Sequence, residues 1–328
     1  MYSSLSPLLT TMKVFGLYFK RGTNDGEQTS GKKSHCRCNL AMIYAAAVLV
    51  LMWLDMIRMF SALSPPNTFG PLLFFKLTTV SWKILCVISQ STYFAVCYSG
   101  RLDRELQRIK LSEQCAAYSR RMAFIHASAA WVLIVMNFAF KVYAIFFTDG
   151  YMDIMLVPIT THFKVSDLLV PRIFTLIIIG VYFNAAWILP HTMSFMLAII
   201  FKHRFQQLGK SFEKLLEERD EGRVTDSDIE TFRQKHQKIS MSVSQTDDFL
   251  MFHNAGAFCC QLLNEILFLY DLIFYRTIND PVVIGMRVFW MFGVTVGLCV
   301  TAAGGIMVNH YVSRLHTLNI LLLSGRAH

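Results

Sequence analysis

The sequence has 328 residues and a formal net charge of +9, with 54% hydrophobic and only 16% charged residues. A soluble domain usually carries about 25% charged residues, so a water-soluble globule is the weaker interpretation. The apolar residues gather in long blocks, and about 20 apolar residues as helix cross a hydrocarbon core of about 30 Å. The basic excess therefore indicates the cytoplasmic ends of membrane helices rather than a nucleic-acid surface.

The first 40 residues form a polar, basic leader around one short apolar stretch, Val14 to Phe19, and show no pattern of a cleavable signal peptide. We expect this leader to be a cytosolic segment of its own. The first membrane span must then act as the targeting signal.

Six segments after the leader are predicted to cross the membrane, because each is apolar over a sufficient length. Spans one to four fall within residues 41–201, and spans five and six within residues 251–308. The six segments are residues 41–63, 72–99, 123–147, 170–201, 251–275 and 282–308. Pro190, followed by His191, is expected to kink the fourth span, because its ring removes a helix hydrogen bond. The predicted fold class is an all-α, polytopic membrane helix bundle.

The orientation follows from lysine and arginine, since short loops rich in them stay cytoplasmic. The leader, residues 100–122 and residues 202–250 are rich in both, whereas the alternate connections hold at most Lys164 or Arg276. The sequence therefore predicts a multi-pass membrane protein with a cytosolic N-terminus. After six crossings, residues 309–328 would form a cytosolic C-terminal tail.

Residues 202–250 predict a cytosolic helical hairpin rather than a solvated charged connector. Thr225 and Asp228 form a capping signal between two runs of apolar residues at helical spacing. The two runs are Phe205, Leu208, Phe212, Leu215 and Leu216, then Ile229, Phe232, His236, Ile239 and Val243. The second run can pack against the first or against another subunit.

The layout resembles the insect-type gustatory and odorant receptor superfamily. The leader reads PLLTTMKVFGLYFK from Pro7 to Lys20, and span four runs on into the hairpin. The stretch from Gln245 to Tyr275, QTDDFLMFHNAGAFCCQLLNEILFLYDLIFY, resembles the fifth helix of these receptors and its approach.

This resemblance implies a gustatory-type chemosensory receptor, a subunit of a ligand-gated cation channel with a role in taste. It implies a homo- or hetero-tetramer with related subunits, and a small-molecule ligand bound in the outer half of the bundle. The family has seven spans, and its last helix lines the pore and carries Thr-Tyr, five apolar residues, then Gln-Phe. That pattern is missing here, so the resemblance implies a chain that keeps the pocket and lacks the pore.

Ionisable and aromatic side chains within the spans are the candidate ligand-binding residues. A charge near the bilayer centre costs about 2.5 to 3.5 kcal/mol and needs a partner. Lys83 and Glu265 lie at similar depth and are expected to pair or to share a watery pocket, with or without a ligand. The aromatic candidates near the outer ends are Trp82, Tyr143, Tyr182 and Trp290, since pockets are mostly apolar with few polar groups.

Other function classes find less support. A G-protein-coupled receptor would have an outside N-terminus and its own signatures, and a small transporter would show inverted repeats. We expect no catalytic residues, because the sequence contains no nucleophile elbow and no phosphate-binding glycine loop. It predicts no metal site, no cofactor and no nucleic-acid partner.

Overall fold

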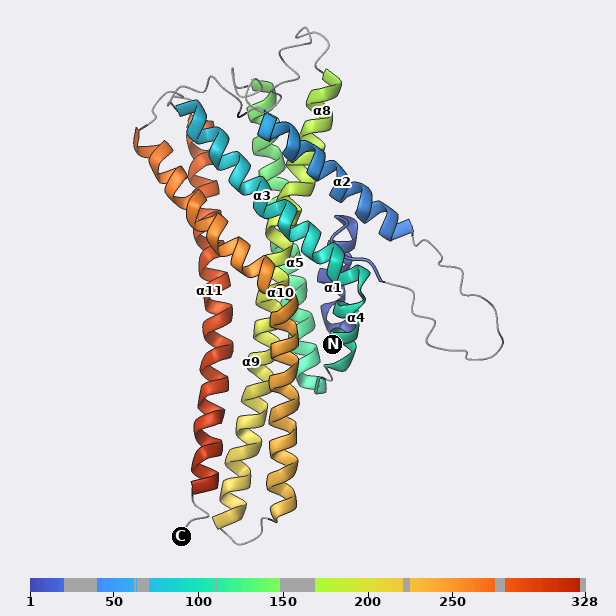
Figure 1. Ribbon diagram of the computed structural model, residues 1–328, viewed down its shortest axis with the longest axis vertical. Helices are drawn as coiled ribbons and strands as arrows, with labels where there is room; N and C mark the ends of the chain where they lie inside the picture. Colours follow the sequence, from blue (N-terminus) through green and yellow to red (C-terminus); the bar gives the residue numbers. More distant parts are fainter. Residues whose placement is uncertain are drawn as a thin grey trace, which may run out of the picture.

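The computed structural model describes residues 1–20, 40–61, 63, 71–109, 111–147, 169–220, 225–274 and 281–324 (Figure 1). All the regular structure in these residues is helical, so the predicted all-α fold class is confirmed for them. The elements are α1 (Tyr2–Val14), α2 (Leu40–Ser61), α3 (Pro71–Tyr98), α4 (Arg101–Arg108), α5 (Glu113–Phe147), α8 (Leu169–Ile177), the π-helical η2 (Ile178–Phe183), α9 (Asn184–Asp220), α10 (Asp226–Phe274) and α11 (Pro281–Ser324).

The long helices alternate in direction along the chain. In Figure 1 the ends of α2, α5 and α10 and the starts of α3, α8 and α11 all point to the upper side. These helix ends, which flank the segments predicted to be poor in basic residues, therefore lie on one side of the bundle. The arrangement is compatible with the predicted topology, while the orientation in a membrane stays a prediction.

Five helices among the described residues are long and apolar enough to span a bilayer. They cover Leu40–Phe60, Lys76–Tyr98, Glu113–Phe147, Ile173–Glu218 and Ile284–Ser313. The remaining predicted span, residues 251–275, falls in α10 up to residue 274. Residue 275 lies outside the described residues. Gln261, Asn264 and Glu265 lower the hydropathy of this part of α10, which packs along α3 and α11. Its crossing of the membrane stays a prediction.

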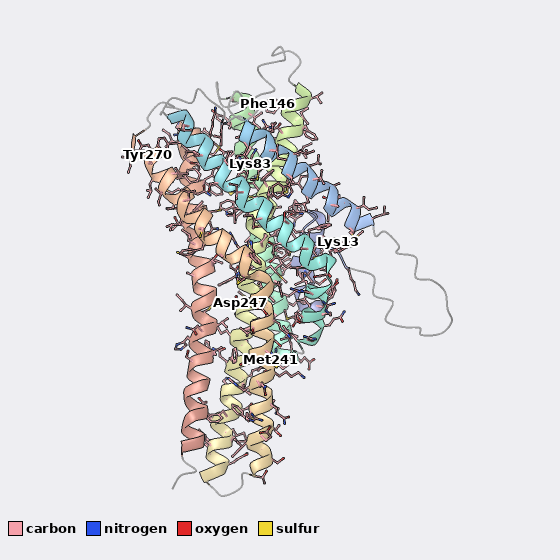
Figure 2. The ribbon with its side chains drawn as sticks, in the orientation of Figure 1. Lys13, Lys83, Phe146, Met241, Asp247 and Tyr270 are labelled. Carbon is pink, nitrogen blue, oxygen red and sulfur yellow. The ribbon has the colours of Figure 1, made fainter. Side chains whose placement is uncertain are left out.

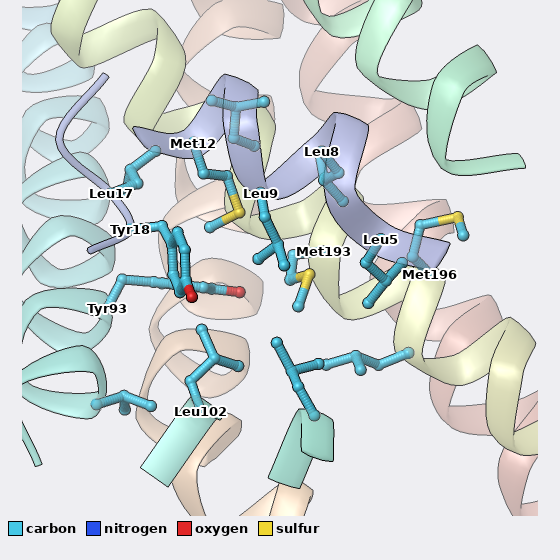
Figure 3. Close-up of a cluster of buried hydrophobic side chains, with 14 of the residues drawn as sticks. Leu5, Leu8, Leu9, Met12, Leu17, Tyr18, Tyr93, Leu102, Met193 and Met196 are labelled. Carbon is cyan, nitrogen blue, oxygen red and sulfur yellow. The ribbon is translucent and has the colours of Figure 1, made fainter. Parts of the chain in front are cut away.

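The leader has a structure that its polar composition did not suggest. Helix α1 packs against α5, and one face of it enters the main apolar cluster with α3, α4 and α9 (Figure 3). The side chains of Leu5, Leu8 and Met12 are fully buried. Burial of each such side chain contributes about 1.5 to 3 kcal/mol relative to exposure in water. The start of the leader is thus part of the bundle core, whereas its placement in the cytosol stays a prediction.

A tight turn after α1 joins this helix to the bundle. Gly16 has φ 71°, in the left-handed region that favours glycine, and a Cβ there would lie 3.3 Å from the Cα of Ala45. Its carbonyl accepts a hydrogen bond from the amide of Gln90 at 2.8 Å. Tyr18 then donates its hydroxyl to a carboxylate oxygen of Asp103 in α4 at 2.7 Å.

The lower part of the bundle is a helical hairpin of α9 and α10 (Figure 1). Phe205, Leu208, Phe212, Phe232 and Ile239 form a separate buried cluster between its two helices. At the start of α10, the hydroxyl of Thr225 accepts from the Asp228 backbone at 3.3 Å, and the carboxylate of Asp228 accepts from the Thr225 backbone at 3.0 Å. This is the predicted capping box. Whether the hairpin lies in the cytosol stays a prediction.

Helix α11 extends beyond the predicted end of the sixth span at residue 308. It continues to Ser324, and Tyr311 accepts a hydrogen bond from the amide of Gln206 in α9 at 2.8 Å. Most of the predicted tail is therefore helix in this structure, and residues 325–328 lie outside the described ones.

Candidate functional site

A small cavity lies in the upper part of the bundle, between α3, α5, α9, α10 and α11. Its volume is about 40 Å³, which is enough to hold a water molecule. Four of its nine lining residues are aromatic and four are polar, and apolar rings with a few placed polar groups are typical of small-molecule sites. The lining residues are Thr78, Thr79, Trp82, Lys141, Asn184, Trp187, Phe268, Trp290 and Val294.

Three indole rings, from α3, α9 and α11, form part of the wall. Trp290 in α11 donates its indole N–H to the side-chain oxygen of Asn137 in α5 at 2.7 Å, which fixes the ring orientation. Trp187 in α9 lies against Gly293 of α11, where an added Cβ would lie 2.8 Å from the ring. The absence of a side chain at Gly293 therefore leaves the space that the Trp187 ring occupies, because any larger residue would displace the ring.

Lys141 is the charged residue of the cavity wall. Its side chain is only 3% exposed, and its Nζ lies 4.7 Å from the ring centroid of Trp82 and 4.6 Å from that of Trp290. Two indole faces stabilise a desolvated ammonium by about 2 kcal/mol each in favourable cases, which offsets part of its burial cost. Among the residues that the structure describes, no carboxylate lies within ion-pair distance of this nitrogen.

A π-helical segment, η2, lies between α8 and α9 and ends directly before the cavity residue Asn184. η2 ends at Phe183, and the amide of Asn184 donates to the carbonyl of Gly180 at 2.7 Å. Such segments often occur where a helix must reorient a functional side chain. Helix α9 continues through Pro190, so the helix does not end there, and the kink expected at this residue stays a prediction.

A second buried charge cluster lies beside the cavity but does not line it. Lys83, on α3 in the upper half of the bundle (Figure 2), donates to the carboxylate of Asp55 in α2 at 2.5 Å. Arg58 binds the other oxygen of the same carboxylate at 2.7 Å. One carboxylate thus serves two cations, and Lys83 also lies over the ring of Phe183 at 5.4 Å.

Two of the six predicted ligand-binding residues, Trp82 and Trp290, line the cavity. The other four, Lys83, Tyr143, Tyr182 and Glu265, lie elsewhere. The direct pairing suggested for Lys83 and Glu265 is wrong, since Lys83 binds Asp55 and Glu265 accepts from the hydroxyl of Thr295 at 2.9 Å.

The two tyrosines face other neighbours. Tyr182 accepts a hydrogen bond from the hydroxyl of Tyr44 in α2 at 3.2 Å, and Tyr143 stacks on Phe147 with 5.5 Å between ring centroids. Any contact of these two residues with a ligand stays a prediction.

Seven lining residues were not predicted from the sequence: Thr78, Thr79, Lys141, Asn184, Trp187, Phe268 and Val294. Lys141 carried the signal that singled out Lys83, an ionisable residue inside an apolar span, and could have been found by the same argument. The other six gave no such signal, because aromatic, aliphatic and small polar residues are common in all the spans and only the packing selects these.

A wider cavity of about 520 Å³ lies closer to the hairpin, between α9, α10 and α11. His191, Asn254 and Thr301 supply polar groups there, but Phe195 and Phe201 are its only aromatic lining residues in the part of the chain described. Its lining residues include Asp247 but, in the described ranges, no lysine or arginine. We therefore take the upper cavity, with the buried Lys141 on its wall, as the stronger candidate for ligand recognition.

No family model and no curated protein matches the sequence. The structure is similar to that of the insect olfactory receptor OR5 from Machilis hrabei, with a TM-score of 0.69 and 10% sequence identity. The match covers 93% of this chain and 79% of that receptor chain. The chain therefore has the fold of an insect olfactory receptor.

Proposed function

We propose that this chain is a chemosensory receptor subunit of the odorant and gustatory type, which binds a small molecule in the tryptophan-lined cavity and takes part in gating cations. The similarity of fold to an insect olfactory receptor over 93% of the chain supports this proposal most directly. The gustatory subtype rests on the resemblance of the leader and of residues 245–275. The proposal gives the protein no enzymatic role.

The cavity is placed where a ligand can act on several helices at once. Its wall combines side chains of α3, α5, α9, α10 and α11. At about 40 Å³ it must enlarge to accept a ligand, and Phe268, whose ring is not part of the contact with Lys141, is only partly buried. A ligand that binds the enlarged form better shifts the bundle toward it. We propose that this shift is the input to gating.

We propose a multi-pass protein of the plasma membrane with a cytosolic hairpin. We also propose that it assembles with further copies or with related subunits into a tetramer. The proposed role for Tyr143, Tyr182, Lys83 and Glu265 is at most indirect, through helices that carry the cavity wall.

Ligand-evoked current in cells that express the full chain, alone and with a related receptor subunit, tests this function. Trp290→Ala should abolish the response to any active compound without loss of surface expression. Trp53→Ala is a matched control, because Trp53 is 43% exposed on α2 and donates to Ser91, away from the cavity. Equal loss in both variants, or no ligand-dependent current in either expression format, would contradict the proposal. A current from the chain alone would show that it forms a pore by itself.

A further inference from the structure

We infer that the tryptophan-lined cavity selects small carboxylic acids, with the carboxylate bound by Lys141 and the apolar part held between the indole rings. This inference rests on the proposed function, since it names the ligand class of the same cavity. It follows from the balance of buried charge in the upper half of the bundle.

The carboxylate of Asp55, near the cavity, already has cationic partners. Asp55 binds both Lys83 and Arg58, so one negative charge serves two positive ones. Lys141 adds a third cation at the neighbouring cavity and has no carboxylate partner among the described residues. A buried ammonium without an anion is unfavourable, so an anionic ligand would complete this site.

The ammonium of Lys141 lies between two indole rings. Trp82 and Trp290 hold Lys141 Nζ at 4.7 and 4.6 Å from their ring centroids, on the cavity wall. The hydrogen bond from the Trp290 indole N–H to Asn137 keeps one of these rings in place. The cation is therefore held in position before a ligand arrives, which reduces the ordering cost of binding.

The other residues of the cavity wall indicate which body the ligand should have. Apart from Lys141, the wall is made of indole and phenyl rings, Val294 and the short polar side chains Thr78, Thr79 and Asn184. These surfaces suit a short alkyl or aromatic body. An amine would add a fourth positive charge and is disfavoured, while an alcohol could accept a hydrogen bond without balancing the charge.

The test uses the full-length protein in nanodiscs at pH 7, where a carboxylic acid is ionised. Binding is followed by tryptophan fluorescence and by thermal shift for three probes of similar shape, hexanoate, hexan-1-ol and hexylamine. Hexanoate should bind about tenfold more tightly than hexan-1-ol, as a charge-assisted hydrogen bond predicts, and hexylamine least tightly. Lys141→Met should abolish the preference for hexanoate, Lys141→Arg should keep it, and Lys210→Met, at an exposed lysine of the hairpin, should leave it unchanged.

The outcomes separate this inference from the proposed function. Saturable binding of hexanoate and hexan-1-ol with equal affinity overturns the acid preference and leaves the cavity as a ligand site. Binding of all three probes that Trp290→Ala does not weaken, or no binding at all, overturns the proposed site itself. The comparison of probes on the unaltered chain needs no variant, so it decides the matter even where Lys141→Met fails to fold.

Discussion

The Nζ of Lys83 in α3 lies 2.5 Å from a carboxylate oxygen of Asp55 in α2, and both side chains are buried. This pair ties two helices together in the upper half of the bundle. Arg58, one turn along α2, binds the other oxygen of the same carboxylate. The carboxylate of Asp55 therefore compensates the fully buried ammonium of Lys83 and also binds Arg58.

Asp55→Asn should strongly destabilise the protein, because it leaves the fully buried Lys83 without an anion. Removing one partner of a buried pair typically costs about 3 to 5 kcal/mol. The measurement is thermal unfolding of the purified protein in detergent. Glu230→Gln is the control, since Glu230 pairs with Arg233 on the exposed surface of α10 and should leave the midpoint unchanged. If Lys83→Met together with Asp55→Asn is no more stable than Asp55→Asn alone, the pair is not the cause.

A second prediction concerns the attachment of the leader. Tyr18→Phe removes the hydroxyl that donates to the buried Asp103, and should cost about 1 to 3 kcal/mol because a buried acceptor loses its partner. The local readout is trypsin cleavage after Lys13 or Lys20, which should become faster. Tyr2→Phe is the matched control, because among the residues described the hydroxyl of Tyr2 bonds to that of Tyr18 alone, at 3.2 Å, and Tyr2 is 37% exposed. Similar cleavage of both variants would argue against Tyr18 as the anchor.

The same contact predicts a pH dependence. Burial, and after it the hydrogen bonds with Tyr2 and Asp103, raise the pKa of Tyr18 well above its usual value of 10.0. The folded state therefore holds this proton where the unfolded state loses it. The resulting stabilisation is complete below pH about 10 and declines as the pH rises further. Unfolding midpoints between pH 8 and 11 should thus fall less steeply for Tyr18→Phe than for the unaltered chain. Parallel curves would contradict this assignment.

The helices and the hairpin could be predicted from the sequence, because their signals are local. Apolar length defines the spans, and the capping box of Thr225 and Asp228 together with the spacing of Phe205, Phe212 and Phe232 defines the hairpin. These patterns act within one helix or between two consecutive ones. They therefore need no knowledge of the rest of the fold.

The leader and the site depend on contacts far apart in the sequence. Helix α1 buries Leu5 and Leu8 only because α9 and α4 lie beside it, so its own composition gives no indication of burial. Asp55 is 28 residues from Lys83, and the register between α2 and α3 decided that it, rather than Glu265, is the partner. The predicted aromatic candidates included two of the cavity residues, Trp82 and Trp290. Telling these two from the other candidates requires knowledge of how the helices pack.

The predicted orientation can be tested on intact cells with an amine reagent that does not cross membranes, followed by mass spectrometry. Lys13 and Lys238 are both exposed in the structure and should react only after the cells are permeabilised, because both are expected in the cytosol. Lys164, in a connection expected outside, should react in intact cells. Reaction of Lys13 and Lys238 from opposite sides would contradict the topology, whatever the ligand.

Because Gly293 contacts Trp187, adding one methyl group at position 293 tests whether the Trp187 ring forms part of the cavity wall. In Gly293→Ala the new Cβ would lie 2.8 Å from the Trp187 ring, so the ring must move against the cavity. We expect a loss of about 1 to 3 kcal/mol in stability, as for overpacking of a core, and weaker binding of every cavity ligand. Gly285→Ala is the matched control on the same helix, because its Cβ meets nothing within 4 Å. It should instead stabilise α11 by about 0.5 to 1 kcal/mol through helix propensity. Equal effects of the two substitutions on binding would show that Trp187 does not form part of the site.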